Sequence, residues 1–472
     1  MSKMKDKYKY LGKNTIIFGI SSFSTKFLSF LLVPVYTAVL STYEYGIADL
    51  INTTTTLLIY ILTINISSSI LRFTLEQRER EKEILSYGVR IVLRGSLICA
   101  VGMWVIYWLG VLDWPLYYFC FIILLFFATA FYELMANYLR GIGKIIAVAV
   151  SGIISAFVVI ISNILFLLVV KLGIIGYLIS FVAGPLIATV YCMIAARKPI
   201  SIYIYSSCEK QLCKEMVAYC IPLIFNNIAL WINAFLDRYF VTAICGVSEN
   251  GVYSAASKIP NILAISFTAF GQAWNLSAIK EFDSEDKDGF FSKTYKIYGT
   301  LMTVGCSFVI LLNIPLARFL YSRDFFAAWQ YSSVLLIATM FNTFTAFIGS
   351  VFSAVKHTKI IAETTVISAI VNICLNVMLI PLWGVLGAAI ATAIAYVVMW
   401  IVRLIYLRQF IRLRINLVRD IITYILLAIQ VIFEHMDRHC YVGQSVCFLI
   451  IVILNIKQIM SIAGTKARSI RT

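Results

Sequence analysis

Long apolar segments follow one another along the whole chain and are separated by short polar gaps. A run of about 20 apolar residues has the length that crosses a ~30 Å hydrocarbon core as a helix. The pattern predicts fourteen transmembrane helices, over residues 14–40, 47–70, 89–110, 116–136, 146–170, 174–196, 216–245, 259–279, 297–317, 329–352, 361–381, 384–406, 418–434 and 443–462. No gap is long enough for a soluble domain, so we expect an all-α polytopic membrane protein.

Lysine and arginine residues gather in every second gap. The basic gaps begin at Lys3, Arg72, Arg140, Arg197, Lys280, Lys356, Arg403 and Lys457. The other gaps hold only Lys171, Lys258, Arg318, Arg323 and Arg438. Because basic residues are retained on the cytoplasmic side, we expect both termini in the cytoplasm and Glu44, Asp113 and Glu434 outside. The net charge of +16 then reflects contact with anionic membrane lipid and does not indicate nucleic acid.

The chain also repeats itself. YTAVLSTYEYGIADL (36–50) matches FVTAICGVSENGVYSAA (240–256), and the segment 143–180 resembles 358–393, with GIIG opposite GVLG. Six spans separate the copies, so both copies have the same orientation in the membrane. We therefore expect two six-helix bundles, 1–196 and 216–406, joined by a linker, 197–215, and followed by two appended helices, 407–472. Such parallel repeats enclose a central cavity and rock to open it on alternate sides.

A charge in the middle of a span costs roughly 2.5–3.5 kcal/mol on insertion scales, so it is expected to face a cavity or a partner. Lys26 lies midway along the first span, among serine and threonine residues, which either line a wet cavity or hold the lysine by hydrogen bonds. Asp237 and Arg238 lie in the seventh span. Sequence neighbours do not share a helix face, so each meets a different partner. Asp237 either pairs with Lys26 or Lys258 or only fixes helix packing.

Further polar residues extend this set of candidates. Arg72 ends the second span, where snorkelling to lipid headgroups is an alternative role. Asn233 adds polarity to the seventh span. Gln272 and Trp274 lie in the eighth span, and an amide with an indole suits a sugar, although interfacial anchoring explains the tryptophan equally well.

Several classes of site are not indicated. Eleven cysteines are scattered without a CxxC motif, so neither a disulfide framework nor a zinc site is expected. His435 and His439 are spaced i, i+4 beside Asp437 and Cys440, but a short external loop is a weak case for a metal. There is no nucleotide-binding loop and no large external loop with paired carboxylates, so we expect a transporter without a cofactor and not an enzyme. A coupling ion, H⁺ or Na⁺, stays open.

The phrases LDRYFVTAICGVSENGVYSAASKIP (236–260), FSTKFLSFLLVPVYTAVLSTYEYGIADL (23–50), SSSILRF and LRGIGKI resemble the bacterial polysaccharide flippases. That family belongs to the multidrug/oligosaccharidyl-lipid/polysaccharide exporter superfamily. The resemblance implies twelve core helices, here with two more. It implies transfer of undecaprenyl-diphosphate-linked oligosaccharide across the bacterial inner membrane, before polymerisation into O-antigen of lipopolysaccharide, capsule or exopolysaccharide.

The resemblance also implies partners and site residues. The partners would be membrane lipid, a polysaccharide polymerase and a chain-length regulator. The family's cation-lined cavity maps onto Lys26, Arg72, Arg238 and Lys258. A diphosphate headgroup is held well by such cations. A lipid II flippase would be similarly cationic and stays open as an alternative. A multidrug exporter of cations would favour an acidic cavity, for which the chain offers mainly Asp237 and Glu133.

Overall fold

The computed structural model describes residues 30–197, 208–280, 282–287, 289–411, 413–436, 440–456 and 458. Within these residues the regular structure is entirely helical. The chain divides into two compact units, Met1–Phe235 and Leu236–Thr472, and each is described by itself. The boundary between the units falls inside one long helix, α10.

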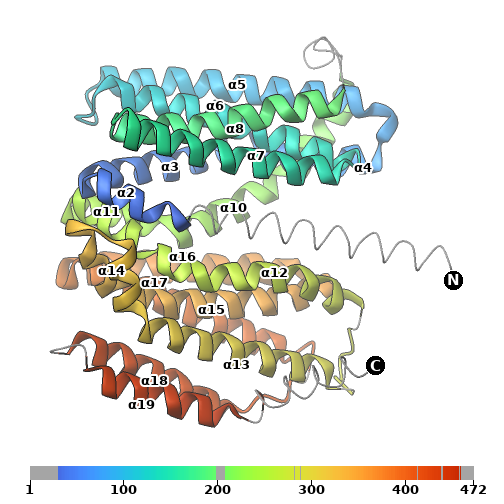
Figure 1. Cartoon of the computed structure of the whole chain (residues 1–472). Helices are drawn as coiled ribbons and strands as arrows, with labels where there is room; N and C mark the ends of the chain where they lie inside the picture. The colour runs from blue at the N-terminus through green and yellow to red at the C-terminus, as the bar shows by residue number, and fades with distance from the viewer. Residues whose placement is uncertain are drawn as a thin grey trace. The chain divides into compact units, whose positions relative to one another are not determined.

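The first unit contains the helices up to the first part of α10 (Figure 1). They are α2 (Val33–Val39), α3 (Thr42–Leu62), α4 (Ile66–Glu76), the 3-10 turn η1 (Arg78–Arg80), α5 (Glu81–Trp108), α6 (Leu116–Gly141), α7 (Ile145–Asn163), the π-helical segment η2 (Ile164–Val169), α8 (Ile174–Ala196) and α10 (Lys210–Cys245). The predicted spans 116–136, 146–170 and 174–196 match α6, α7 with η2, and α8 within about five residues at each end. The helices α5 and α10 begin about eight and six residues before their predicted starts, and most of the predicted first span, 14–40, lies outside the described residues.

The second unit begins with the end of α10 and contains the remaining helices (Figure 1). They are α11 (Val247–Ala256), α12 (Lys258–Lys280), α13 (Phe290–Leu311), α14 (Asn313–Leu320), the 3-10 segment η3 (Arg323–Ala328), α15 (Trp329–Ala354), α16 (Thr358–Trp383), α17 (Val385–Leu407), α18 (Leu417–His435) and α19 (Tyr441–Leu454). An aromatic cluster forms part of its core: Trp274 stacks on Phe347 with ring centroids 4.1 Å apart, and Phe270 stacks on Tyr298.

Two predicted spans are interrupted. The span 47–70 is not one helix, because Ile64 and Asn65 adopt positive φ angles of 55° and 51° and separate α3 from α4. The span 297–317 ends early and continues as the short helix α14. Left-handed backbone costs about 1–2 kcal/mol at a non-glycine residue, and hydropathy does not register it. The prediction of a continuous helix was therefore wrong at Ile64 and Asn65. It was also wrong at Leu312, where φ −93° and ψ 2° separate α13 from α14 without a left-handed residue.

The repeated sequence motifs adopt the same local structure in each unit. Glu44 is the third residue of α3, and Glu249 is the third residue of α11. Each of these helices follows a short connection from the preceding helix. Gly173 and Gly384 precede α8 and α17 with nearly the same dihedral angles, φ 56°, ψ −137° and φ 57°, ψ −138°. This backbone region is essentially restricted to glycine, which explains why both copies keep a glycine there.

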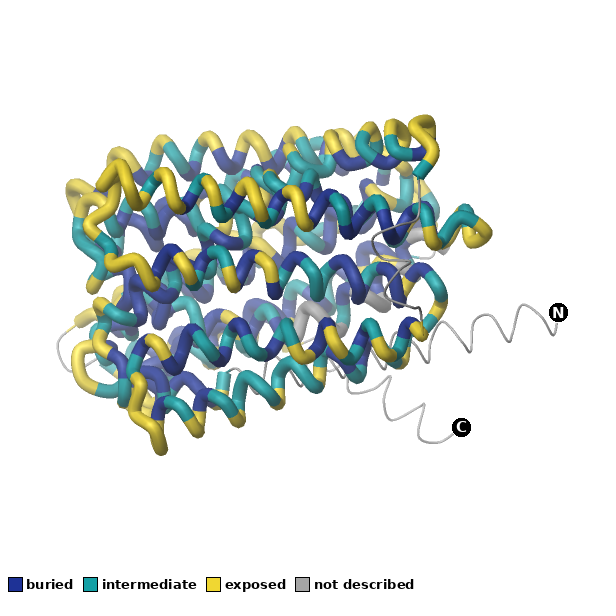
Figure 2. Tube along the Cα trace, turned by 90° about the horizontal axis from the view of Figure 1, so that it is seen from above, coloured by how far each residue is buried: buried dark blue, intermediate teal, exposed yellow. Residues whose placement is uncertain are grey.

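Exposed residues follow the outer faces of the helices (Figure 2), and many of the exposed residues are large and apolar. Trp108 is 78% exposed, Leu382 71% and Ile194 70%. Among the described residues, ten helices are long and apolar enough to cross a membrane. Extensive apolar exposure of this kind is unfavourable in water and suits a lipid environment. The chain is therefore a multi-pass membrane protein. The predicted first, eighth, thirteenth and fourteenth spans are not among the ten.

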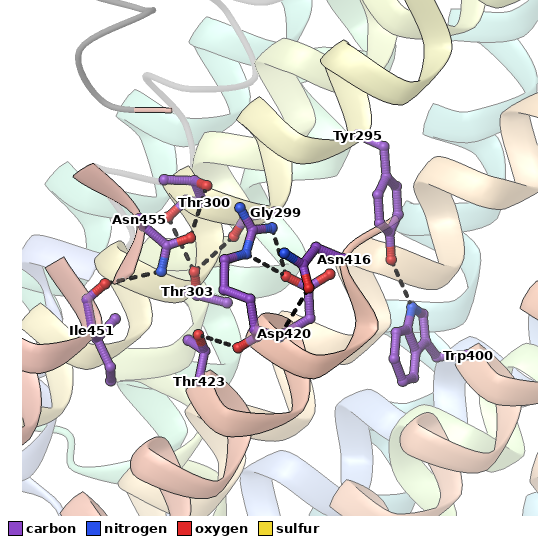
Figure 3. Close-up of polar contacts among 11 residues, drawn as sticks. Tyr295, Gly299, Thr300, Thr303, Trp400, Asn416, Asp420, Thr423, Ile451 and Asn455 are labelled. Atoms are coloured by element: carbon purple, nitrogen blue, oxygen red, sulfur yellow. Dashed lines mark hydrogen bonds and ion pairs between the residues drawn. The ribbon is translucent and has the colours of Figure 1, made fainter. Parts of the chain in front are cut away.

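The appended helices α18 and α19 pack on α13 and on the start of α14 through buried polar side chains. The Ser307 hydroxyl donates to Gln430 Oε1 over 2.6 Å, and Asn313 donates to Glu434 Oε1 over 2.7 Å. At the other end of the seam, Thr300 donates to Asn455 (Figure 3). The cavity lined by Thr300, Thr423 and Asn455, among others, has a volume of only about 10 Å³. This volume holds no more than one water molecule. This seam therefore holds helices together and is not a binding site.

Candidate functional site

A buried carboxylate lies in the second unit, on α10. Asp237 is 3% exposed. Its Oδ2 atom accepts hydrogen bonds from the Tyr253 hydroxyl of α11 and, over 3.1 Å, from the Thr392 hydroxyl of α17. Its Oδ1 atom accepts from the backbone N–H of Arg238 over 3.0 Å. These donors are neutral, so they stabilise the carboxylate without cancelling its charge.

Two asparagines of α16 extend this group of polar residues. Asn376 donates to Asn372 Oδ1 over 3.0 Å, and Asn372 donates to Thr392 Oγ1 over 3.4 Å. Both amides are almost completely buried. Within the described residues, Asn376 Oδ1 has no hydrogen-bond partner, and an unsatisfied buried acceptor costs about 1–3 kcal/mol. We call Asp237, Tyr253, Thr392, Asn372 and Asn376 the Asp237 cluster.

Tight connections between consecutive helices bring the members of the Asp237 cluster together. Gly246, at φ 103°, ends α10 and starts α11, which places Tyr253 against the carboxylate one helix earlier. Gly384, at φ 57°, ends α16 and starts α17. That tight connection lays the two helices against each other, so Asn372 meets Thr392.

The cationic candidates of the second unit are Arg238 and Lys258. Arg238 is buried, with 9% exposure, and its carbonyl oxygen accepts from Thr242 over 2.7 Å. Lys258 is half-buried and is the first residue of α12. One of the two interpretations left open for Asp237 was a pair with Lys26 or Lys258. Lys26 lies outside the described residues, and the contacts of Asp237 described above are with hydroxyls and a backbone amide.

Arg72 lies in the last turns of α4, in the first unit, and its side chain contacts Glu76 and Tyr219. Its Nε atom donates to Glu76 over 3.0 Å, its side chain is 51% exposed, and its guanidinium lies 4.6 Å from the centre of the Tyr219 ring. The nearby carboxylate offsets its charge, so Arg72 can bind an anion only by sharing or releasing Glu76. An exposed pair of this kind contributes only about 0–1 kcal/mol, which leaves that exchange inexpensive.

Three further predicted residues have different outcomes. Asn233 is buried and donates to the Ala229 carbonyl one turn earlier on α10, over 3.0 Å. Gln272 is part of α12, but its side chain is outside what the structure describes. Trp274 departs from the expectation of a cavity residue. It is 2% exposed within the aromatic cluster, and its indole N–H donates to the Phe347 carbonyl over 3.0 Å.

The sequence did not single out Arg403, which is 4% exposed on α17. Its guanidinium donates to the Thr345 carbonyl, the Thr364 hydroxyl, the Thr365 hydroxyl and the Ile361 carbonyl, over 2.7 to 3.3 Å. We had placed it among the charges of a cytoplasmic gap. The signal that could have found it is the adjacent hydroxyl pair Thr364 and Thr365 within a predicted span, since a buried arginine needs such acceptors.

His435, which belongs to the weak metal candidate of His435 and His439, has hydrogen-bond partners of its own. Both ring nitrogens of His435 lie 2.9 Å from carbonyl oxygens, those of Val431 and Gln330. His439 and Asp437 are outside the described residues. Within the described part of the chain there is no group of three or more metal-ligating side chains.

The sequence matches a family model described as "Polysaccharide biosynthesis protein" over residues 11–275, which is more than half of the chain. No curated protein matches it. Its fold is similar to that of the lipid II flippase MurJ in an inward closed conformation, with a TM-score of 0.69 and 16% identity over 97% of this chain and 100% of that one.

Two other solved structures are similar as well. A multidrug resistance MATE family transporter in an inward-facing conformation has a TM-score of 0.67 and 12% identity, over 83% of this chain and 98% of that one. A MOP superfamily transporter from Pyrococcus furiosus, described by the reversed polarity of its binding pocket, has a TM-score of 0.60 and 11% identity, over 85% of this chain and 96% of that one. At these identities the likeness establishes the fold alone.

Proposed function

The chain belongs to the polysaccharide biosynthesis protein family, and on that premise we propose that it is a flippase for undecaprenyl-diphosphate-linked oligosaccharides. The family match carries this proposal, and a transporter fold supports it. The protein would act in the bacterial inner membrane, with both termini in the cytoplasm. It would deliver repeat units to a polysaccharide polymerase and a chain-length regulator on the outer side. Alternating access of two six-helix bundles would supply the movement.

The cargo headgroup is a diphosphate, which needs cations. We propose that the diphosphate is held by Lys26, Arg72, Arg238 and Lys258. Arginine and lysine bind phosphate oxygens by charge-assisted hydrogen bonds. Among the described members, Arg238 should attract the diphosphate most strongly. It is buried, and the electrostatic attraction between opposite charges is stronger in a buried site than at an exposed one.

Genetic complementation tests this function. A strain that lacks the protein should keep its lipid-linked oligosaccharide on the cytoplasmic leaflet and show no surface polymer, with unchanged drug susceptibility. Leaflet-specific lectin labelling of membrane vesicles measures the first effect, and efflux of a lipophilic cation from the same vesicles measures the second. Normal outer-leaflet sugar with impaired cation efflux would refute the flippase and favour a multidrug exporter.

Variants then test the site. Arg238→Ala and Lys26→Ala should each abolish or sharply reduce surface polymer while the protein stays in the membrane, and Lys26→Arg should retain more function than Lys26→Ala. Arg318→Ala is the matched control, because Arg318 is an exposed arginine in a gap predicted to face outside. Full complementation by both alanine variants would show that these cations are packing residues.

A lipid II flippase is the second candidate, and coverage favours it over a multidrug exporter. The MurJ match leaves about 3% of this chain, roughly 14 residues, unmatched, which is far fewer than the appended segment 407–472 contains. The MATE match covers only 83%. Depletion of the protein separates the two flippases: loss of surface polymer with normal growth supports our proposal, whereas arrest of cell-wall synthesis supports lipid II.

We also propose that the Asp237 cluster binds the coupling ion, H⁺ or Na⁺. An intramembrane carboxylate is a functional hypothesis by default, and the hydroxyl and amide oxygens around Asp237 are ligands that suit a hard cation. Asp237→Asn keeps the size of the side chain but removes its charge, so it should abolish ion-driven transport. Transport into proteoliposomes under a Na⁺ or a pH gradient identifies the ion. Undiminished gradient dependence in Asp237→Asn would refute the assignment.

A further inference from the structure

An open pocket lies where α17 connects to α18, in the second unit. Its volume is about 420 Å³, within the range of about 300–1,000 Å³ typical of small-ligand sites. Its lining is aliphatic apart from a single arginine: Leu404, Leu407, Arg408, Ile411, Leu413, Ile415 and Leu417. A pocket with six aliphatic residues and one cation suits an amphiphile with an anionic head.

The wall of this pocket is held in place by contacts on its far side. Phe410 packs on Phe352 and on His357, with ring centroids 5.9 and 4.7 Å apart. Ile411 is 2% exposed. The backbone N–H of Arg414 donates to the Ser292 hydroxyl over 2.8 Å. The connection is therefore anchored to α13, α15 and the start of α16, and the pocket is a built feature of the unit.

Among the described residues of this connection, Arg408 and Arg414 are exposed cations. Arg408 lines the pocket, and Arg414 lies between two lining residues in the sequence. Among the residues that the structure describes, neither guanidinium has a hydrogen bond or an ion pair. This contrasts with Arg403, one turn earlier, whose donors are bonded inside the unit. Unpaired cations on an apolar pocket attract a negatively charged group.

The surroundings of the pocket are also apolar and exposed. Val418 is 70% exposed, Ile405 59% and Ile421 51%. The lining therefore continues into surface that faces lipid in a multi-pass membrane protein. The charge pattern places this end of the unit on the cytoplasmic side, where anionic lipids attract Lys and Arg by about 1 kcal/mol each.

We propose that this pocket binds an anionic phospholipid of the inner leaflet. One acyl chain would lie among Leu404, Leu407 and Leu413, and the phosphate would contact Arg408, with Arg414 beside it. Bilayer phospholipid is the favoured source because the apolar rim is continuous with the lipid-facing surface. The site is separate from the flippase function and would be present whatever the cargo.

The experiment measures lipid binding to the purified full-length protein in detergent. Phosphatidylglycerol, phosphatidylcholine and undecaprenyl phosphate are titrated separately, and bound lipid is counted by native mass spectrometry. The wild type should prefer phosphatidylglycerol to phosphatidylcholine. Arg408→Gln should weaken phosphatidylglycerol binding about fivefold and the double variant with Arg414→Gln about 25-fold, with phosphatidylcholine unchanged. Ile415→Trp fills the pocket from the connection and should weaken both phospholipids.

The controls change the same residue types elsewhere. Arg318→Gln removes an exposed arginine outside the pocket, and Leu382→Trp adds a ring to an exposed position of α16. Equal losses in these controls would show nonspecific annular lipid and overturn the proposal. Unchanged binding in Arg408→Gln would overturn it too. Tighter binding of undecaprenyl phosphate, lost in Ile415→Trp, would assign the pocket to the cargo lipid instead. None of these readouts depends on transport.

Discussion

Arg403 gives a prediction whose size follows from its contacts. The guanidinium is buried and bonded to neutral acceptors only, among them the Thr364 hydroxyl, 3.0 Å from Nε. Thr364 in turn donates to the Ile360 carbonyl over 2.8 Å. The hydroxyl thus uses its hydrogen on its own helix and its lone pair on the arginine. Thr364→Val removes that lone pair at nearly constant volume and leaves one guanidinium N–H unsatisfied.

The expected coupling is the value of one hydrogen bond to a charged group. Such bonds contribute about 1.5–3 kcal/mol. Thr364→Val should therefore destabilise the wild type by at least that amount. In an Arg403→Met background the guanidinium is absent, and the same substitution should cost much less, because replacing both hydrogen-bond partners by apolar groups of similar shape is nearly neutral. The difference between the two backgrounds isolates the pair.

Thermal unfolding of the four proteins in one detergent measures this cycle. For a unit of about 240 residues, 1 kcal/mol corresponds to roughly 2–4 °C, so the coupling should appear as several degrees. Thr294→Val is the control, since its hydroxyl makes the same i−4 bond, to Phe290, on α13, and it should be additive with Arg403→Met. Equal costs of Thr364→Val in both backgrounds would refute the reasoning that neutral hydroxyls support the buried charge.

Three other predictions use different features of the chain. Gly384→Ala should destabilise the protein by about 1–3 kcal/mol in thermal unfolding, because the φ of 57° at this position is strained for alanine. Gly102→Ala should stabilise the protein by about 0.5–1 kcal/mol, because Gly102 lies within a helix with open space around it. The reverse order of these two effects would contradict the assigned backbone conformation. The backbone amides of Lys287 and Glu285 lower the pKa of Asp283 from its ordinary 3.8. The stabilisation that these two hydrogen bonds give the loop is therefore complete above pH 3.8 and is lost as the pH falls through the lowered pKa. Limited proteolysis should show that loss in the wild type, and an equal loss in Asp283→Asn would contradict it. In a background without the eleven native cysteines, an impermeant thiol reagent applied to intact cells should label Asp113→Cys and spare Lys287→Cys, and labelling of the second would overturn the topology.

The sequence predicted the helices well because a bilayer imposes one simple rule on them. Each span must be apolar over about 20 residues, and ten of the described helices obey this rule, whereas α12, α18 and α19 are not among those ten. The repeat was equally visible, since Gly173 and Gly384 occupy a conformation that few other residues tolerate. Ile64 and Asn65 gave no such warning, because a left-handed residue that is not glycine leaves no mark on hydropathy.

The candidate site was predictable only in part, because charge can be read from a sequence and its partners cannot. Asp237 stood out as a carboxylate within a span, yet its donors come from α11 and α17, which no local pattern connects to it. Trp274 shows the same limit, because its indole bonds a carbonyl 73 residues away, which no local pattern indicates. Arg403 was classed with the surface charges because it lies within one turn of a helix end, where both burial and snorkelling are available to an arginine.

Asp237 and Arg403 together indicate which helices an ion at the Asp237 cluster would move. Arg403 binds α17 to both α15 and α16, and these are the helices with which α17 packs most extensively. Asp237 itself lies on α10, and the hydroxyls of Tyr253 and Thr392 reach it from α11 and α17, so the carboxylate joins these three helices. A cation that took over the carboxylate would release those two hydroxyls and loosen the end of α10 from α11 and α17. The helix α11 would keep its own bond to α15, from the Ser332 hydroxyl to the Ala256 carbonyl. Ion binding would therefore shift the end of α10 relative to α11, α15, α16 and α17.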